Sequence, residues 1–148
     1  MADPTPDVPA RISFVTLGAA DVPAMRRFYA AWGWTEGPGG TADFAQFLLA
    51  NTRFALYRRD LLHAEAAPDL PDAGAGSWSG VTLSINVGRR EAVDSAYAAA
   101  VRAGGRAVAQ PTSRDWGGYS GYIGDPEGHR WEIAWLPTYD PAPAPAAP

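Results

Sequence analysis

Short stretches in which hydrophobic and polar residues alternate predict most of the strands in this chain. Residues 80–87 are the clearest example, because every second residue is a branched aliphatic and the positions between are polar or small. Residues 130–136 alternate in the same way, with Trp131 and Ile133 on one side and Glu132 on the other. Since successive side chains of a strand point to opposite faces, each stretch predicts one buried face and one polar face. Further strands are predicted at 11–18, 34–40 (a fragment), 42–49, 53–57, 106–109 and 121–123.

Two stretches place apolar residues at helical spacing instead. The first carries them at i, i+3, i+4 and i+7, from Met25 to Trp32. It is predicted to begin after Asp21, whose carboxylate can accept from the free first-turn amides, and to end at Gly33, which tolerates the left-handed conformation. The second covers residues 93–101 and is closed by Gly104 and the glycine that follows.

The order of these elements occurs twice, as strand, helix and three further strands. Residues 29–31 and 97–99 both read Tyr-Ala-Ala near the end of a helix, and the strand at 53–56 corresponds to the strand at 130–133. Such duplication is typical of repeated units that cannot bury their sheet faces alone. We therefore predict an α+β fold of two βαβββ modules in one domain at 11–136, with module 1 at 11–60 and module 2 at 80–136.

Composition changes outside these modules. Residues 61–79 are poor in periodicity and predict an irregular connector, which could cover a cavity through Leu61, Leu62 and Trp78. Residues 1–10 and 137–148 are rich in proline, which favours extended backbone, so both ends are expected to be disordered tails.

Charge and composition exclude several classes of function. The net charge is -4, and the 12 Lys and Arg residues are scattered, whereas a nucleic-acid surface needs concentrated positive charge. No apolar run approaches the roughly 18 residues of a membrane span, and the first residues do not resemble a secretory signal. The absence of cysteine excludes disulfides and thiolate chemistry. The expected location is the cytoplasm.

The final hairpin resembles a known family. Asp125-Pro126-Glu127-Gly128 has the residues of a type I turn, and the whole stretch, DPEGHRWEIAW, resembles the closing hairpin of the vicinal oxygen chelate superfamily. That superfamily includes glyoxalase I, bleomycin-resistance proteins and extradiol dioxygenases. The stretch FVTLGAADVPAMRRFYAAWGW is similar to its first strand and helix. The resemblance covers residues 11–136 and implies a cupped mixed sheet around one cavity and a homodimer.

The resemblance also implies four positions for the ligands of a divalent metal inside the cup. Here they hold Phe14, Ala55, Thr82 and Glu132. Phe and Ala cannot coordinate a metal, and a neutral hydroxyl is a weak ligand beside a carboxylate or imidazole. Both histidines, His63 and His129, fall outside these positions. We therefore expect a degenerate metal site and no cofactor, with a bound divalent metal as the less favoured alternative.

Without a metal, the cup reads as a pocket for a small molecule. Apolar and hydrogen-bonding groups predicted to face inward, together with an aromatic clamp on a glycine-rich bend, have the usual composition of such a pocket. Glu132 would be its carboxylate, and it needs a partner such as Arg53, Arg130 or water, because a buried unpaired charge is costly. The predicted ligand-binding residues are Phe14, Thr16, Ala55, Thr82, Ser84, Asn86, Trp116 and Tyr119.

Three functions remain open at this stage. The first is a metal-free binding protein similar to the bleomycin-resistance branch, which sequesters an aromatic or cationic metabolite or antibiotic. The second is a metal-independent isomerase, lyase or cyclase with Glu132 as the catalytic general base. The third is a metal-dependent lyase or dioxygenase of the glyoxalase type. The expected partners are a small-molecule ligand and a second copy of the chain, without nucleic acid or membrane.

Overall fold

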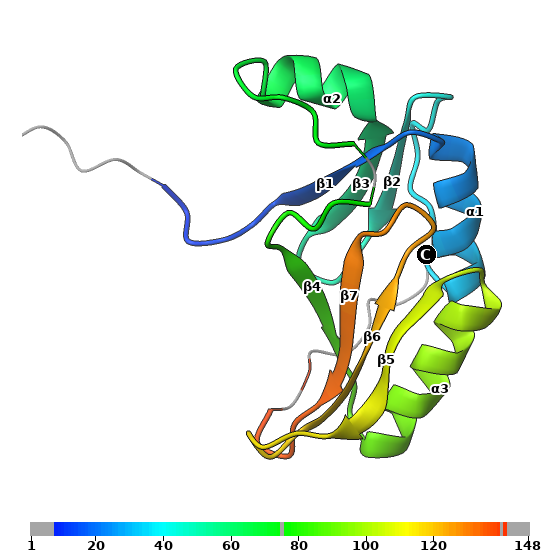
Figure 1. Ribbon diagram of the computed structural model, residues 1–148, viewed down its shortest axis with the longest axis vertical. Coiled ribbons are helices and arrows are strands. Elements are labelled where there is room, and N and C mark those ends of the chain that lie inside the picture. Colours follow the sequence, from blue (N-terminus) through cyan, green and yellow to red (C-terminus); the bar gives the residue numbers. More distant parts are fainter. Residues whose placement is uncertain (1–7, 75, 140, 142–148) are drawn as a thin grey trace, which may run out of the picture.

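The computed structural model describes residues 8–74, 76–139 and 141. Figure 1 shows three helices packed around two twisted sheets. Most residues of the two predicted tails lie outside the described ranges. In chain order the elements are β1 (Phe14–Ala19), α1 (Val22–Trp32), β2 (Phe44–Leu48), β3 (Arg53–Arg58), α2 (Arg59–Ala66), β4 (Thr82–Asn86), α3 (Arg90–Arg102), β5 (Arg106–Ser113), β6 (Tyr119–Gly124) and β7 (Arg130–Trp135).

The two sheets repeat the same strand pairing. In the first, β3 lies between β1, its parallel partner, and β2, its antiparallel partner. In the second, β7 likewise lies between parallel β4 and antiparallel β6, and β5 forms the far edge. The last strand of each module therefore pairs with the first strand of that module. This internal repeat confirms the α+β fold that the sequence duplication predicts.

The first helix forms where its capping residues indicate. The Asp21 carboxylate accepts from the amide of Ala24 at 2.8 Å, and Gly33 has a φ of 117° in the left-handed region. The amide of Gly33 returns to the carbonyl of Ala30, which satisfies a carbonyl group at the helix end. Local sequence therefore fixes both ends of α1.

One hydrophobic core joins the two modules. On each sheet, every second residue of a strand points toward the helices. Phe54 in β3 and Ile133 in β7 are examples, and they are buried under α1 and α3. Trp131 of the second module lies in edge-to-face geometry with Phe54, Trp34 and Tyr29 of the first, at centroid distances of 5.3–6.1 Å. Such aromatic pairs add to the free energy gained from burial alone. Trp32, from the helical stripe, and Trp135, from the alternating strand, pack against this core, as their spacing predicts.

Three expectations about the elements need correction. The irregular connector begins instead with helix α2, whose first residue Arg59 forms an ion pair with Asp72 of the following loop. The fragment predicted at 34–40 forms only one isolated bridge, between Glu36 and Phe47 of β2. The glycine turn that follows Glu36 directs the chain away from β2. The strand predicted at 106–109 continues to Ser113. Among the described residues, the helices are too short or too polar to cross a membrane.

Candidate functional site

The turn of the closing hairpin is a rigid, hydrogen-bonded unit. The amide of Gly128 donates to the carbonyl of Asp125 at 3.0 Å, which is the i to i+3 bond of a β-turn. Gly128 has a φ of 93°, a conformation that side chains disfavour. Pro126 precedes it at the position where a fixed φ suits the turn. The predicted turn therefore holds the residues around it in one arrangement.

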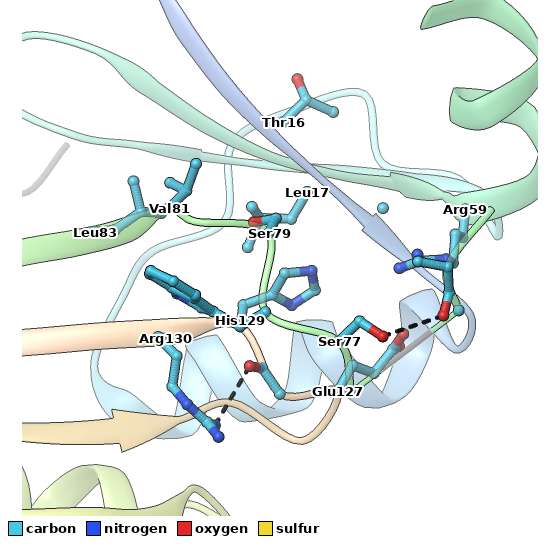
Figure 2. Close-up of a pocket in the computed structure, with 16 residues that line it drawn as sticks. Thr16, Leu17, Arg59, Ser77, Ser79, Val81, Leu83, Glu127, His129 and Arg130 are labelled. Atoms are coloured by element: carbon cyan, nitrogen blue, oxygen red, sulfur yellow. Dashed lines mark hydrogen bonds between the residues drawn. The ribbon is translucent and has the colours of Figure 1, made fainter. Parts of the chain in front are cut away.

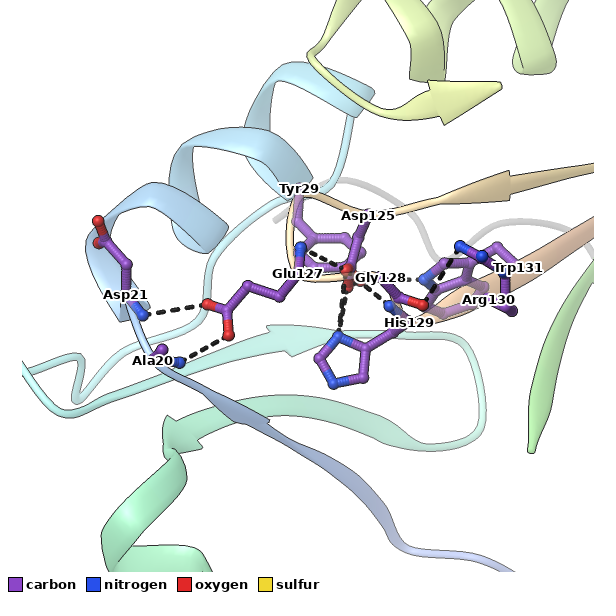
Figure 3. A network of polar contacts seen from close by, with 9 residues as sticks. All are labelled: Ala20, Asp21, Tyr29, Asp125, Glu127, Gly128, His129, Arg130 and Trp131. Carbon is purple, nitrogen blue, oxygen red and sulfur yellow. Dashed lines mark hydrogen bonds and ion pairs between the residues drawn. The ribbon is translucent and has the colours of Figure 1, made fainter. Parts of the chain in front are cut away.

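Asp125 lies at the centre of a buried polar network (Figure 3). Its side chain is 0% exposed, and its carboxylate accepts from the hydroxyl of Tyr29 at 2.7 Å and from Nδ1 of His129 at 2.8 Å. The amides of Glu127 and His129 also donate to it, both at 3.0 Å. Burial and then the neighbouring carboxylate raise the pKa of Tyr29 well above its ordinary value, so this hydroxyl stays protonated.

Glu127 fastens the same turn to the first module. Its carboxylate accepts from the amides of Ala20 and Asp21 at 2.7 and 3.0 Å, at the corner where β1 meets α1 (Figure 3). The positive end of a helix dipole and its free amides favour a carboxylate at this place. The hairpin that carries Glu132 is thus fixed in position by contacts across about a hundred residues of sequence.

Glu132 belongs to a cluster of hydroxyl groups on the second sheet. Its carboxylate accepts from Ser84 Oγ at 2.9 Å and from the hydroxyl of Tyr122 at 3.0 Å. Ser84 and Tyr122 are the residues paired directly with Glu132 on β4 and β6, so all three side chains share one face. The helix on this sheet, α3, packs on the opposite face, where Ile133 lies buried. The Glu132 cluster (Glu132, Ser84 and Tyr122) is therefore accessible to a ligand.

The predicted cationic partners of Glu132 are engaged elsewhere. Arg53 donates to the side-chain oxygen of Gln46 at 3.0 Å, and Arg130 extends over Gly124 toward the carbonyl of Gly128. Two neutral hydroxyl donors take their place. They leave further lone pairs of the ionised carboxylate available, because such a group accepts about four hydrogen bonds.

The surroundings of Tyr122 shift the pKa of its hydroxyl, and this shift can be measured. Burial raises the pKa of its hydroxyl, and the hydrogen bond to Glu132 and the charge of that carboxylate raise it further. The guanidinium of Arg114, 5.5 Å from the ring centroid, acts in the opposite direction.

We expect Glu132→Gln to lower the pKa of Tyr122 while leaving it above the ordinary value. The substitution removes the charge and the carboxylate acceptor, but burial, the largest cause of the shift, remains. The neutral phenol of Tyr122 stabilises the fold fully below the pKa of the unfolded chain, and this contribution is lost as pH rises through the folded value. Spectrophotometric titration of tyrosinate measures the change, with Tyr122→Phe identifying the group. An unchanged titration would contradict the hydrogen bond.

The other predicted pocket residues fall into two separate groups. Thr82, Ser84 and Asn86 lie on the Glu132 face of the second sheet. Phe14, Thr16 and Ala55 share a face of the first sheet, where Thr16 pairs directly with Ala55. Phe14 is 50% exposed whereas Ala55 is fully buried. The two groups correspond by the internal repeat, and their role in binding stays a prediction.

The two residues of the predicted aromatic clamp have different surroundings. Trp116 is 53% exposed, and its ring lies against Gly118. Tyr119 points toward α3, where its hydroxyl donates to Asp94 at 2.7 Å and the guanidinium of Arg90 lies 4.2 Å from its ring centroid. The residue of β6 that reaches Glu132 is Tyr122, three residues further on.

A pocket of about 290 Å³ lies between the two modules (Figure 2). The end of β1, the start of β4, the β6–β7 turn and part of the loop 73–79 form its walls. His129 and Arg59 line it, and Trp78 lies at its edge with 69% exposure. Among the described residues its lining includes Thr16 but no other residue of the predicted ligand set.

The donor set around Glu132 does not fit the divalent metal that the fold family implies. The three other expected ligand positions hold Phe14, Ala55 and Thr82, and the groups that contact the carboxylate are neutral hydroxyls. Within the part of the chain that is described, no three His, Asp or Glu side chains are grouped as a metal site would require. We therefore assign no step of any reaction to a metal.

Comparison with known proteins agrees with this architecture. The family model described as "Glyoxalase/Bleomycin resistance protein/Dioxygenase superfamily" matches residues 11–133. The chain belongs to this superfamily. The comparison with curated proteins finds no match for this glyoxalase-superfamily chain.

Solved structures of the glyoxalase superfamily share the fold over most of their length. A glyoxalase-related enzyme from Fulvimarina pelagi has a TM-score of 0.80 at 25% identity, covering 94% of this chain and 99% of its own. A glyoxalase/bleomycin resistance protein/dioxygenase family enzyme from Burkholderia phytofirmans PsJN has a TM-score of 0.71 at 21% identity, covering 84% and 97%. Lactoylglutathione lyase from Agrobacterium tumefaciens has a TM-score of 0.66 at 20% identity, covering 86% and 95%.

Proposed function

We propose that this protein binds a cationic aromatic small molecule at the Glu132 cluster. The observation that carries the proposal is a carboxylate held by two neutral hydroxyls, Ser84 and Tyr122, on the sheet face opposite helix α3. A charged or hydrogen-bond-donating group of the ligand would take the remaining lone pairs of Glu132. The superfamily name includes bleomycin resistance, which supports a cationic, aromatic-rich ligand as the first one to test.

A second copy of the chain would complete this site. Thr82 and Ser84 on β4 are exposed, and so is Phe14 on the corresponding strand of the first sheet. The polar residues on β4 and the apolar Phe14 were predicted to line one cup, and in the described chain they are exposed to solvent. We propose a homodimer in which the Phe14 face of the first sheet of one protomer lies opposite the Glu132 face of the second sheet of its partner.

Binding is favoured over turnover by the chemistry of the cluster. Both hydroxyls donate to Glu132, so one lone pair of each carboxylate oxygen is already engaged within the protein. A general base needs a lone pair directed at the substrate and a matched basicity. The same arrangement suits an anionic anchor for a cationic ligand.

The test is a binding experiment with a matched pair of probes. Benzamidine and benzamide share shape and aromatic character, but only benzamidine carries a positive charge. We expect benzamidine and metal-free bleomycin to raise the melting temperature, since ligands stabilise the state they bind. Glu132→Gln should weaken benzamidine binding roughly tenfold or more, because a charge-assisted hydrogen bond contributes roughly 1.5–3 kcal/mol, while benzamide binding should barely change.

The controls separate loss of the site from loss of the fold. Glu132→Gln should keep the melting temperature of the ligand-free protein within a few degrees. Light scattering on the same samples reports whether the protein is a dimer. If the wild-type protein binds benzamide and benzamidine equally, or if Glu132→Gln leaves benzamidine affinity unchanged, the proposed function is wrong.

A further inference from the structure

His129 lines the pocket between the modules, and a hydrogen bond to a buried carboxylate holds its ring in one orientation. Nδ1 of His129 lies 2.8 Å from the buried carboxylate of Asp125, an acceptor when ionised, so Nδ1 carries the ring proton. In the neutral ring, Nε2 then has its lone pair free. Among the contacts of the described residues, Nε2 has no hydrogen-bond partner, and the imidazole lines the pocket (Figure 2). The pocket therefore presents a fixed hydrogen-bond acceptor.

A guanidinium approaches the same pocket from α2. Nε and Nη2 of Arg59 donate to the carboxylate of Asp72 at 2.6–3.1 Å, and this pairing lowers the pKa of Asp72 to about 2. Nη1 takes no part in these bonds, and Figure 2 shows the guanidinium directed toward the pocket that His129 lines. Arg59 thus holds a fixed orientation and keeps unused donors on the pocket side.

The other charged groups that line the pocket direct their charges toward other partners. Glu127 directs its carboxylate to the amides of Ala20 and Asp21. The guanidinium of Arg130 extends away from His129 and lies over Gly124 (Figure 2). Arg59 keeps one terminal nitrogen, Nη1, outside its bonds to Asp72, which suits a single carboxylate group of a ligand. A volume of about 290 Å³ limits the ligand to a small molecule.

We propose that this pocket is a second site, which binds a small hydroxycarboxylate. The carboxylate of the ligand accepts from Nη1 of Arg59, and its hydroxyl donates to Nε2 of His129. No covalent bond changes in this step. The site shares no residue with the Glu132 cluster, so it goes beyond the function proposed above.

The test follows the imidazole of His129 by NMR during titration with glycolate and with acetate, which lacks the hydroxyl. The chain has two histidines, and comparison with His129→Gln assigns the ring signals. We expect glycolate to shift the Nε2 signal saturably at concentrations up to about 100 mM, a range suited to very small ligands. Acetate should bind at least tenfold more weakly, because it leaves Nε2 without a donor.

Matched variants identify the groups involved. Arg59→Gln should weaken glycolate binding at least tenfold, whereas Arg130→Gln, which removes the guanidinium directed away from His129, should not. Asp72→Asn leaves every donor of Arg59 intact and keeps one oxygen acceptor for it, so it should retain binding, which distinguishes loss of the donor from local misfolding. Glu132→Gln should also retain it, so failure here is separable from failure of the proposed function. Absence of a saturable shift, equal binding of acetate, or full binding by Arg59→Gln would overturn the second site.

Discussion

Asp125→Ala is expected to lower the free energy of unfolding by about 3–5 kcal/mol, because it leaves several buried donors without an acceptor. The hydroxyl of Tyr29 and Nδ1 of His129 lose their partner, and so do the amides of Glu127 and His129. These groups belong to the first helix and to the closing turn, so the substitution weakens a contact between modules. Denaturant unfolding followed by circular dichroism at neutral pH measures the change.

Asp125→Asn is the matched control for this prediction. Its carbonyl oxygen can still accept from the two backbone amides, and its amide group can donate to Nδ1 of His129 once the ring proton moves to Nε2. We expect a loss of about 1–2 kcal/mol, since three of the four buried groups keep a partner and only the hydroxyl of Tyr29 loses its acceptor. A loss below about 1 kcal/mol in Asp125→Ala would mean that the network contributes little to stability.

Local sequence was sufficient to predict most of the fold. Alternation in 80–87 and 130–136 identifies β4 and β7 with the correct buried face, because packing on one side of a sheet imposes a period of two. Asp21 and Gly33 mark the ends of α1, because capping depends on neighbouring backbone groups. The repeated order of elements then predicts that the two modules share one arrangement of strands.

Helix α2 shows where such reasoning fails. Its N-cap residue, Arg58, makes no side-chain capping bond, and none of its residues is fully buried, so the stretch has neither a start signal nor a strong apolar stripe. It is held instead by contacts with other segments, such as Arg59 with Asp72 and Glu65 with Tyr57. Tertiary contacts of this kind override weak local propensity.

The site could be predicted only in part, for a related reason. Ser84 and Glu132 were expected to face the same cup, because each lies on the polar side of an alternating stretch, and the structure pairs them directly. Tyr122 was missed, although it pairs directly with Glu132, because the register of β6 against β7 depends on the turn geometry. Nothing in the local sequence shows that Glu127 reaches the amide of Ala20, 107 residues away.

The internal repeat also places the chemistry in one half of the protein. Thr16 and Ala55 pair on β1 and β3 as Ser84 and Glu132 pair on β4 and β7. Ala55 has no functional group at the position that corresponds to Glu132. At the proposed Glu132 site, the carboxylate therefore comes from the second module alone.

Trp131→Ala is expected to lower the free energy of unfolding by about 3–5 kcal/mol, the usual effect of truncating a large buried aromatic side chain. Trp131 is 4% exposed, and its ring lies 5.6 Å from Phe54 and 5.3 Å from Trp34, both in the first module. Its Nε1 donates to the hydroxyl of Tyr29 at 3.0 Å, which in turn donates to Asp125. The substitution removes packing between the modules and one bond of the polar network together.

Two variants separate these contributions. Trp131→Phe keeps an aromatic ring in the core but removes the indole donor, and we expect a loss of about 1–2 kcal/mol from the hydrogen bond and the smaller ring. Trp116→Ala, at a position that is 53% exposed, should change the free energy of unfolding by less than about 1 kcal/mol. Denaturant unfolding of all three compares them directly. If Trp131→Ala destabilises no more than Trp116→Ala, the aromatic core does not hold the modules together, and the orientation of the adjacent Glu132 must depend on other contacts.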